Sequence, residues 1–547
     1  MLKPKPAIFS KNIFFTFIAL LVFGCASIQK PMGGPRDLTP PKLLKATPEN
    51  MTRNFKAKEI RLEFDEFYKL NNQYQEITIS PALEKQPDYK ISKRDLIIDF
   101  KDSLQKNTTY VINFGKAIQD VNEGNIMDNF TYVFSTGPHI DSLSMSGFVV
   151  NSITQEKEKD ATVMIFPVKL DSLLFGKKKP TIFATTDSAG NFTLNNLHDG
   201  QYKIYALKEP SPNKIFDNDK ELIAFSNRTI NLNKDTSGIR LSLFLQIPQK
   251  FRVSEKKLTN DGVLSLVFNK RLTNPSLKII YPQGLDEQKI VDISKTKDTA
   301  LVYMRNMAFD SLRVAIYDNN KPIDTIYQLK GRKEAFTRVL TFKYGINRDN
   351  KLKPNTDLRI TANLPVENIE PGLISITIDS TNVPNLNVQK DPGNPRVIIV
   401  KNRWRAGGKY QLVLNEAAVV DIYGDKNKRT GINFEADKPD NYSQLTLKVN
   451  VPDSSKSYVI ELMDEQKNLI HSDPISKSGS ILYKNYLTGK YKIRVVYDTN
   501  KNGRWDSGNV KLRAQPENIW LYDKEITLRA NWEAEEPIDI PKEQINP

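Results

Sequence analysis

Residues 197–217 read LHDGQYKIYALKEPSPNKIFD, and residues 486–506 read YLTGKYKIRVVYDTNKNGRWD. The two stretches align without a gap. They share Gly200/Gly489, Tyr202/Tyr491, Lys203/Lys492, Ile204/Ile493, Asn213/Asn502 and Asp217/Asp506. Each stretch runs from a Gly-x-Tyr entry through a strand-like segment into a polar loop at a fixed distance. Such a match predicts two domains of one type.

A weaker repeat joins residues 110–136 to residues 410–436. Both segments begin with a Tyr, contain a small Ala and a Gly, and end in an aromatic strand-like segment, and Asp120 corresponds to Asp421. They predict a second type of domain that also occurs twice. Residues 249–345 have the composition of a further β-sandwich with fewer recognisable features.

Apolar and polar residues alternate along most of the chain. The alternation is clear at Ile60, Leu62 and Phe64, at Phe130, Tyr132 and Phe134, at Leu264, Leu266 and Phe268, and at Leu445, Leu447, Val449 and Val451. A period of two places one face of a strand on a core and the other in water. Turn residues recur every 8–12 residues, and no amphipathic helix longer than two turns is expected. The sequence therefore predicts an all-β tandem array of β-sandwiches.

The first 24 residues have the features of a signal peptide. Three lysines precede an 11-residue apolar run, Ile13–Phe23, which is interrupted only by Thr16. Such a run spans about 16 Å as a helix, too short for a bilayer core of about 30 Å but typical of a signal-peptide core. It ends at Gly24-Cys25, and this Cys is the only one in the chain. No other stretch is long enough to span a membrane.

Composition limits the chemistry. A chain of 547 residues with 39% hydrophobic residues has material for three to five domains with real cores. One Cys and three separated His (His139, His198 and His471) argue against a Cys/His metal site and a disulfide framework. The common nucleotide-binding, serine-hydrolase and metalloprotease motifs are absent from the sequence. We therefore expect no enzymatic activity.

The net charge is +15, of which the three lysines of residues 1–24 would leave with a signal peptide. A basic balance suggests nucleic acid as a partner, but export and the lack of a run of five basic residues argue against it. Anionic lipid headgroups, lipopolysaccharide and acidic protein surfaces are the alternatives, together with a merely solvated basic surface.

Several segments resemble known families. PMGGPRDLTPP (31–41), IRLEFDEFYKL (60–70), TTYVINFGKAIQDVNEGN (108–125) and YVFSTG (132–137) resemble the SbsA-type bacterial Ig-like lipoproteins of Bacteroidota. GNFTLNNLHDGQYKIYALKE (190–209) is similar to transthyretin-like, carboxypeptidase-regulatory-like domains. The end of the apolar run resembles a lipobox, which implies that Cys25 becomes the lipidated first residue. A plain signal peptide with an incidental Cys is the alternative.

These observations together predict the domain organisation. We expect a signal peptide (1–24), a lipidated tether rich in Pro and Gly (25–42), an SbsA-type Ig-like domain (43–137), a transthyretin-like sandwich (138–248), a β-sandwich (249–345), an Ig-like domain (346–438), a transthyretin-like sandwich (439–532) and a tail (533–547).

One loop has the spacing of a calcium site. Asp498, Asn500, Asn502 and Asp506 fall at positions 1, 3, 5 and 9, with Gly503 at position 6, as at the start of an Asp/Asn calcium loop. Position 12 is Asn509 rather than Glu, so any site would be weak, on the order of millimolar. The other interpretation is a loop closed by Asx turns, with Trp505 and Phe216 packed onto their sandwiches at equivalent positions. Calcium is the only cofactor the sequence suggests.

An Asp-Ser/Thr-apolar triplet recurs seven times. It resembles the O-glycosylation sequon of Bacteroidota envelope proteins, but Asp-Ser and Asp-Thr are also favoured turn residues, and both interpretations stay open. The candidate acceptors are Ser103, Ser142, Ser172, Ser188, Thr299, Ser311 and Thr325.

The expected function is a non-catalytic, lipid-anchored scaffold. It would be an accessory subunit of an outer-membrane assembly, such as a β-barrel assembly, secretion or nutrient-uptake complex, with envelope or outer-membrane β-barrel proteins as partners. The alternative is a surface glycan-binding or adhesive lipoprotein. A hydrolase would need a further domain for which the repeats leave no room. The resemblance implies an outer-membrane location. Because the tether has no acidic residue before Asp37, surface and periplasmic orientations both stay open, and we expect the surface.

Overall fold

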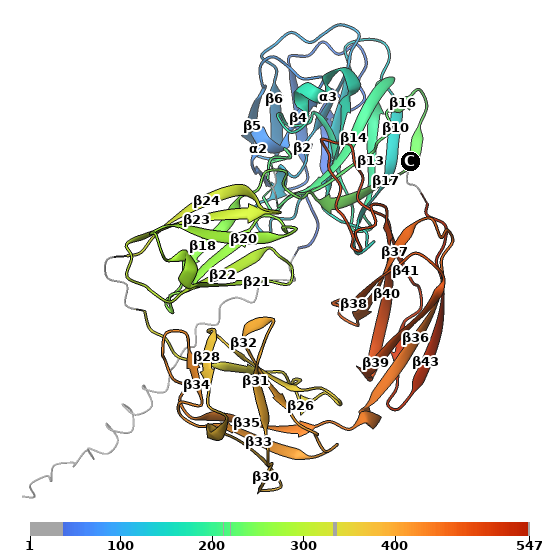
Figure 1. The fold of residues 1–547 in the computed structure, drawn as a ribbon. Helices are drawn as coiled ribbons and strands as arrows, with labels where there is room; N and C mark the ends of the chain where they lie inside the picture. The colour runs from blue at the N-terminus through green and yellow to red at the C-terminus, as the bar shows by residue number, and fades with distance from the viewer. Residues whose placement is uncertain (1–36, 212, 219, 332–335, 545–547) are drawn as a thin grey trace, which may run out of the picture. The chain divides into compact units, whose positions relative to one another are not determined.

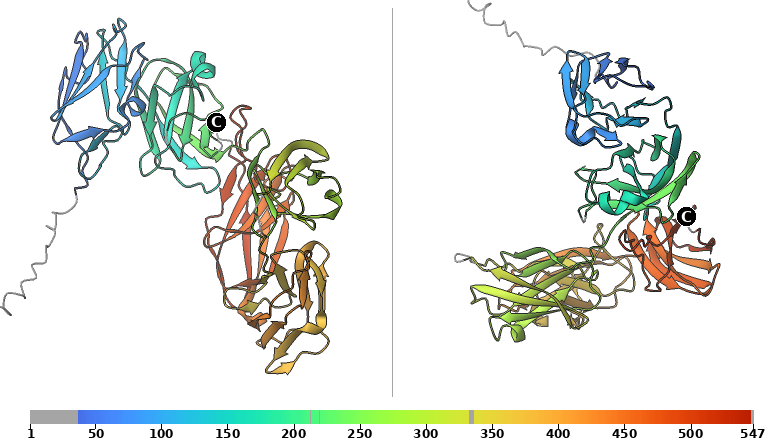
Figure 2. Two further views of the ribbon diagram at one scale, coloured as in Figure 1. Left: turned by 90° about the vertical axis from the view of Figure 1, so that its left-hand side faces the viewer. Right: turned by 90° about the horizontal axis from the view of Figure 1, so that it is seen from above.

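A computed structural model describes residues 37–211, 213–218, 220–331 and 336–544 (Figure 1). Strands are the predominant element in both units (Figure 2). The only α-helices in it are short, α2 (Gln73–Glu76) and α3 (Val168–Leu174). The all-β fold of tandem β-sandwiches is confirmed. The predicted signal peptide, Cys25 and most of the predicted tether lie outside the described residues. The chain divides into two compact units between Ile140 and Asp141.

The first unit is a single β-sandwich. One sheet has the order β1 (Leu43–Thr47), β2 (Glu59–Phe64), β6 (Asp95–Asp99) and β5 (Asp88–Ser92). The facing strands are β4 (Thr78–Ser80), β7 (Thr109–Asn113) and β9 (Thr131–Ser135), with a small pair of β3 (Tyr68–Leu70) and β8 (Ile118–Asp120). Alternate residues Ile60, Leu62 and Phe64 are fully buried between the layers, because the period of two points them all to one side.

The fourth sandwich repeats this topology within the second unit. One sheet has the order β25 (Phe342–Tyr344), β27 (Leu358–Ala362), β32 (Asn394–Lys401) and β31 (Asn387–Asp391). The facing sheet has the order β26 (Lys351–Leu352), β35 (Thr430–Ala436), β33 (Lys409–Leu414), β29 (Ile374–Ile378) and β30 (Thr381–Asn382). A small pair is formed by β28 (Val366–Ile369) and β34 (Val419–Asp421). The hydroxyl of Tyr110 accepts the N–H of Gln105 at 2.9 Å, and the hydroxyl of Tyr410 accepts the N–H of Arg405 at 2.7 Å. The weaker repeat is thus a repeat of structure.

The second sandwich begins the second unit. Its strands follow the order β12 (Ile182–Thr185), β11 (Thr162–Pro167), β14 (Gly200–Lys208), β15 (Leu222–Phe225), β17 (Thr236–Leu245), β10 (Leu143–Asn151) and β13 (Asn191–Leu197), and β16 (Ile230–Leu232) also pairs with β14. β10 and β17 are the first and last strands of this sandwich along the chain, and they pair in parallel. All its other strand pairs are antiparallel.

The fifth sandwich has the same plan. One sheet is β38 (Leu469–Ile475), β37 (Ser457–Asp464), β40 (Gly489–Asp498) and β41 (Ile519–Leu521), with β42 (Ile526–Leu528) also on β40, and the other is β39 (Gly479–Leu487), β36 (Tyr442–Asn450) and β43 (Glu533–Asp539). The prediction that the fifth sandwich ends at residue 532 and is followed by a tail is therefore wrong, because residues 533–539 form its strand β43. β43 pairs in parallel with β36, as β17 does with β10, and buries Ala534 and Ile538.

The third sandwich packs two antiparallel sheets (Figure 1). One sheet has the order β18 (Val253–Leu258), β19 (Leu264–Phe268), β22 (Thr299–Met304) and β21 (Lys289–Ile293). The other has the order β20 (Pro275–Tyr281), β23 (Ser311–Asp318) and β24 (Lys321–Leu329). Short 3₁₀ turns follow β20 (Asp286–Gln288) and precede β29 (Pro371–Leu373) and β36 (Pro439–Asn441).

Candidate interaction site between the second and fifth sandwiches

The loops that follow β14 and β40 share one hydrogen-bond frame. The Asp498 carboxylate accepts the N–H of Asn502 at 3.0 Å and of Gly503 at 2.9 Å. The Glu209 carboxylate accepts the corresponding N–H groups of Asn213 at 2.8 Å and Lys214 at 3.0 Å. The repeat found in the sequence therefore includes the start of each loop.

A second carboxylate closes each loop. Glu517 accepts the N–H of Asp506 at 2.9 Å, and Glu221 accepts the N–H of Asp217 at 3.0 Å. Burial raises the pKa of both glutamates, and also that of Glu209. A buried or half-buried carboxylate is tolerated at these places because backbone N–H groups satisfy its oxygens.

The predicted calcium residues come together in this loop. Asp498 is 2% exposed and also accepts the hydroxyl of Ser457 at 3.1 Å. The side-chain amides of Asn500 and Asn502 donate to Asp506, while their oxygens accept N–H groups of residues 502 and 504 at 3.1 Å. These are Asx turns, which the second interpretation predicts. In the described ranges no cluster of three or more His, Cys, Asp or Glu could hold a metal ion. The calcium loop contains only two such residues, so calcium binding stays a prediction.

The fifth-sandwich loop then departs from its counterpart. Residues 505–516, which we call the docking loop, form a small hairpin in which Asn509 and Ala514 exchange backbone hydrogen bonds of 2.7 and 3.0 Å. Besides the contacts of Arg513, three hydrogen bonds join the docking loop to the second sandwich. They are Ser507 Oγ to the Leu245 carbonyl, Val510 N–H to Gln246 Oε1 at 2.7 Å, and Gln515 Nε2 to the Phe225 carbonyl at 2.8 Å. Segments about 260 residues apart in sequence are thereby held together.

An apolar cluster lies beneath the docking loop. Val510 is 5% exposed and belongs to a cluster whose other buried members all come from the second sandwich: Met164, Phe166, Phe183, Tyr205, Leu207, Ile223, Phe225 and Phe244. Phe216 and Trp505 pack against it. Trp505 was expected to pack on its own sandwich, and the structure corrects this, because the docking loop carries it to the second one.

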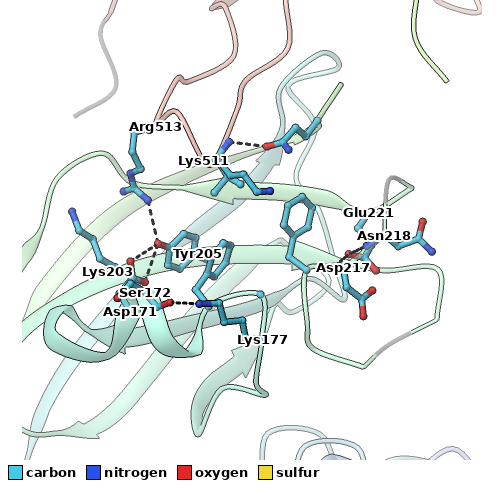
Figure 3. A pocket seen from close by; sticks show the side chains of 15 residues that line it. Asp171, Ser172, Lys177, Lys203, Tyr205, Asp217, Asn218, Glu221, Lys511 and Arg513 are labelled. Atoms are coloured by element: carbon cyan, nitrogen blue, oxygen red, sulfur yellow. Dashed lines mark hydrogen bonds between the residues drawn. The ribbon is translucent and has the colours of Figure 1, made fainter. Parts of the chain in front are cut away.

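Arg513 forms the polar part of the contact. Its guanidinium donates to the Tyr205 hydroxyl at 3.2 Å and to the Ser226 carbonyl, and it lies 4.5 Å from the centre of the Phe225 ring. The Tyr205 hydroxyl donates in turn to Asp171 at 2.9 Å, and burial raises the pKa of Tyr205. The chain of Arg513, Tyr205 and Asp171 crosses the contact between the two sandwiches (Figure 3). Nothing in the sequence marked these residues, because their partners are too distant along the chain.

A cavity of about 860 Å³ lies beside this contact, with α3 and β14 on one side and the docking loop on the other (Figure 3). Its aromatic residues include Phe175, which stacks on Tyr205 with 3.8 Å between ring centres. Charged residues of both signs line it: Asp171, Lys177, Lys203, Asp217, Glu221, Lys511 and Arg513. The mixture of signs favours no single ligand class.

The candidate O-glycosylation residues fall into two groups. Ser103, Ser142, Ser172, Ser188 and Thr325 are exposed, whereas Thr299 and Ser311 are partly buried in β22 and β23. Several of the preceding aspartates have structural roles. Asp187 accepts the N–H groups of Ala189 at 2.9 Å and Asn191 at 2.8 Å, which closes a turn.

The likeness to solved structures is remote. The Bacillus anthracis TIE protein is 9% identical, with 93% of this chain and 75% of that chain covered and a TM-score of 0.15. BcpA, the major pilin subunit of Bacillus cereus, is 11% identical, with 73% and 99% covered and a TM-score of 0.14. A DUF3823 family protein from Bacteroides uniformis is 12% identical, with 34% and 99% covered and a TM-score of 0.12.

Other comparisons concern the sequence. No curated protein matches the chain. Within the described ranges, no helix has the length and hydropathy needed to cross a membrane. The model of the bacterial Ig-like domain matches residues 37–136, so the first sandwich is similar to that family.

Proposed function

We propose that the protein is a non-catalytic scaffold anchored by a lipid at Cys25, and an accessory subunit of an outer-membrane protein assembly. The observation that carries this proposal is the docking loop. It buries Val510 in the second sandwich and so connects the two ends of the second unit. An enzyme needs reactive groups in a cleft, whereas a scaffold needs domains held in a fixed relation.

The use of polar and aromatic residues supports the same conclusion. The carboxylates of buried Asp498 and Glu221 and of half-buried Glu209 accept backbone N–H groups that close loops. Tyr110 and Tyr410 hold corners of sandwiches through their hydroxyls. These groups stabilise the fold, and their hydrogen-bonding capacity is used in doing so.

The partner is a β-barrel assembly, secretion or nutrient-uptake complex, and the chain faces the cell surface. Export through a lipidated Cys25 places the body at a membrane without a spanning helix. The basic surface left after removal of the signal peptide complements acidic envelope components.

Affinity purification of a tagged full chain from detergent-solubilised envelopes tests the proposal. We expect one β-barrel protein to co-purify in a fixed stoichiometric ratio. The Cys25→Ser chain serves as the control, because loss of the anchor should leave the body folded but separated from the membrane and its partner. Recovery of the wild-type chain without any envelope protein, or full membrane retention of Cys25→Ser, would contradict the proposal. Protease treatment of intact cells tests the orientation: cleavage of the body supports the surface, and protection supports the periplasm.

A further inference from the structure

The third sandwich carries a large part of the excess positive charge of the chain. Residues 249–345 contain 18 Lys and Arg against 10 Asp and Glu, in a chain whose net charge is +15. A surface with this imbalance attracts polyanions through long-range electrostatics. The question is where on the sandwich a polyanion would find specific contacts.

The outward face of the β20–β23–β24 sheet supplies such contacts. Figure 1 shows these three strands side by side. Tyr281 of β20 is the cross-strand partner of Arg313 of β23, and Arg313 is the partner of Tyr327 of β24. The neighbours of Arg313 along β23, Leu312 and Val314, are fully buried. Because side chains alternate along a strand, the row Tyr281–Arg313–Tyr327 faces away from the core.

Both tyrosines of the row are open to solvent. Tyr281 is 51% exposed and Tyr327 is 47% exposed, and Leu329, on the same face of β24, is 59% exposed. Neighbouring strands lie about 4.8 Å apart, so the backbones of the two tyrosines are separated by about 10 Å, with Arg313 between them. The row thus places a cation between two aromatic side chains on a sheet surface.

Further cations border the row. Lys278 of β20 pairs with Ala315 of β23, one step along the same face. Lys256 of β18 reaches the edge of β24, where its Nζ donates to the Tyr327 carbonyl at 2.6 Å. The face therefore combines aromatic side chains with cations from β20 and β23, and Lys256 lies at its edge.

We propose that this face binds an acidic polysaccharide, one that bears carboxylate or sulfate groups. Sugar rings pack their C–H faces on exposed Tyr side chains, which offer apolar area and a polar hydroxyl together. The Arg313 guanidinium pairs with an oxyanion through parallel hydrogen bonds, and Lys278 and Lys256 add attraction that salt weakens. This inference does not depend on the scaffold proposal, because it concerns a different sandwich and a different experiment.

A binding assay of the full chain with polygalacturonate tests this proposal. Dextran serves as the neutral probe, and phosphatidylglycerol vesicles serve as the lipid probe. We expect binding to polygalacturonate that weakens as salt is raised, and little binding to dextran or vesicles. Arg313→Ala and the double variant Tyr281→Ala/Tyr327→Ala should each weaken binding at least tenfold. Tyr74→Ala is the matched control, since Tyr74 is 59% exposed but lies in the first unit, and it should bind as the wild type does.

Each other result counts against the proposal. Failure to bind both polygalacturonate and a sulfated glycosaminoglycan would overturn it. So would equal binding to dextran, preferential binding to vesicles, or unchanged affinity in the Tyr281/Tyr327 double variant. Circular dichroism and melting temperature confirm that the variants are folded. Thr325 lies on the same face, across from Ala315, so the protein is produced in a host without O-glycosylation.

Discussion

Gly508 lies directly against Phe244: a Cβ atom on Gly508 would stand 2.7 Å from Cζ of that ring and 2.8 Å from the Ala514 carbonyl oxygen. One partner belongs to the docking loop and the other to β17 of the second sandwich. The absence of a side chain at residue 508 is therefore what lets the two sandwiches approach each other.

Gly508→Ala should weaken the docking of the loop. The added methyl group meets a packed ring and a backbone oxygen, and overpacking of this kind costs about 1–3 kcal/mol. Hydrogen exchange of residues 505–516 should accelerate by at least about fivefold, the change that 1 kcal/mol produces. Gly479→Ala is the control, because nothing lies within 4 Å of a Cβ there, and it should leave exchange unchanged. Equal behaviour of the two variants would show that the contact is not formed in solution.

Arg513 should not tolerate replacement by lysine. The guanidinium serves Tyr205, the Ser226 carbonyl and the face of Phe225 at once, whereas an ammonium group cannot match this planar geometry. We expect Arg513→Lys and Arg513→Ala to weaken the docking of the loop by a similar free energy, about 1–2 kcal/mol. Both variants should therefore be cleaved faster in the docking loop than the wild type. Arg403→Ala, a substitution of an exposed arginine in the fourth sandwich, is the control. Wild-type resistance in Arg513→Lys would mean that charge alone is sufficient.

The sequence predicted those parts of the fold that local pattern determines. Alternation placed Ile60, Leu62 and Phe64 in a core, and the repeated Gly-x-Tyr entry identified two related sandwiches. In both, the Tyr hydroxyl bonds a carbonyl four residues earlier: Tyr202 to His198 at 3.0 Å and Tyr491 to Leu487 at 2.8 Å.

The parts that were missed depend on distant partners. β43 reads EAEEPID, and its charged residues hide the alternation that buries Ala534 and Ile538. Its place is decided by parallel pairing with β36, about 90 residues earlier in the chain. The docking loop has no periodicity, and Val510 is buried by the second sandwich, so neither spacing nor composition could identify the contact.

Truncation after residue 532 should unfold the fifth sandwich. It removes β43 together with the buried side chains of Ile538 and Ile540, which contribute about 1.5–3 kcal/mol each. It also exposes the edge of β36. A chain that ends at residue 544 is the control and should melt as the full chain does. If the chain ending at 532 keeps the wild-type melting temperature, β43 does not belong to the sandwich in solution.

The stability contribution of Glu517 should fall as pH rises. Burial raises the pKa of Glu517 above the ordinary value of 4.5, although backbone N–H groups of Asp506 and Thr499 oppose the shift. The folded state thus holds the proton more tightly than the unfolded state. The contribution of this group is greatest below pH 4.5 and is lost as pH rises through the raised pKa of the folded state.

Glu517→Gln isolates this effect. The amide cannot accept both N–H groups, so the variant pays a constant cost of about 1–3 kcal/mol, but it does not titrate. Melting temperatures from about pH 4 to pH 8 should show the wild type losing its advantage over the variant as pH rises. The exposed Glu465→Gln serves as the control. A constant difference between wild type and Glu517→Gln across this range would contradict the shift.

Calcium binding at the Asp498 loop has a direct test. The oxygens of Asn500 and Asn502 already accept backbone N–H groups, and only Asp498 and Asp506 bring charge, so an ion must compete with an intact network for a weak, millimolar site. About 10 mM Ca²⁺ should raise the melting temperature slightly, and Asp498→Ala with Asp506→Ala should abolish the rise. Glu209→Ala with Asp217→Ala, in the corresponding loop that follows β14, should retain the rise in melting temperature. Without calcium, Asp498→Ala should still cost about 1–3 kcal/mol, because it removes the acceptor of the Gly503 N–H and one of the two acceptors of the Asn502 N–H. Two results would contradict calcium binding: a melting temperature that does not respond to calcium, or a rise that is equal in the Asp498/Asp506 double variant. Either result would show that these residues act only as the frame of the loop that carries Val510 to the second sandwich.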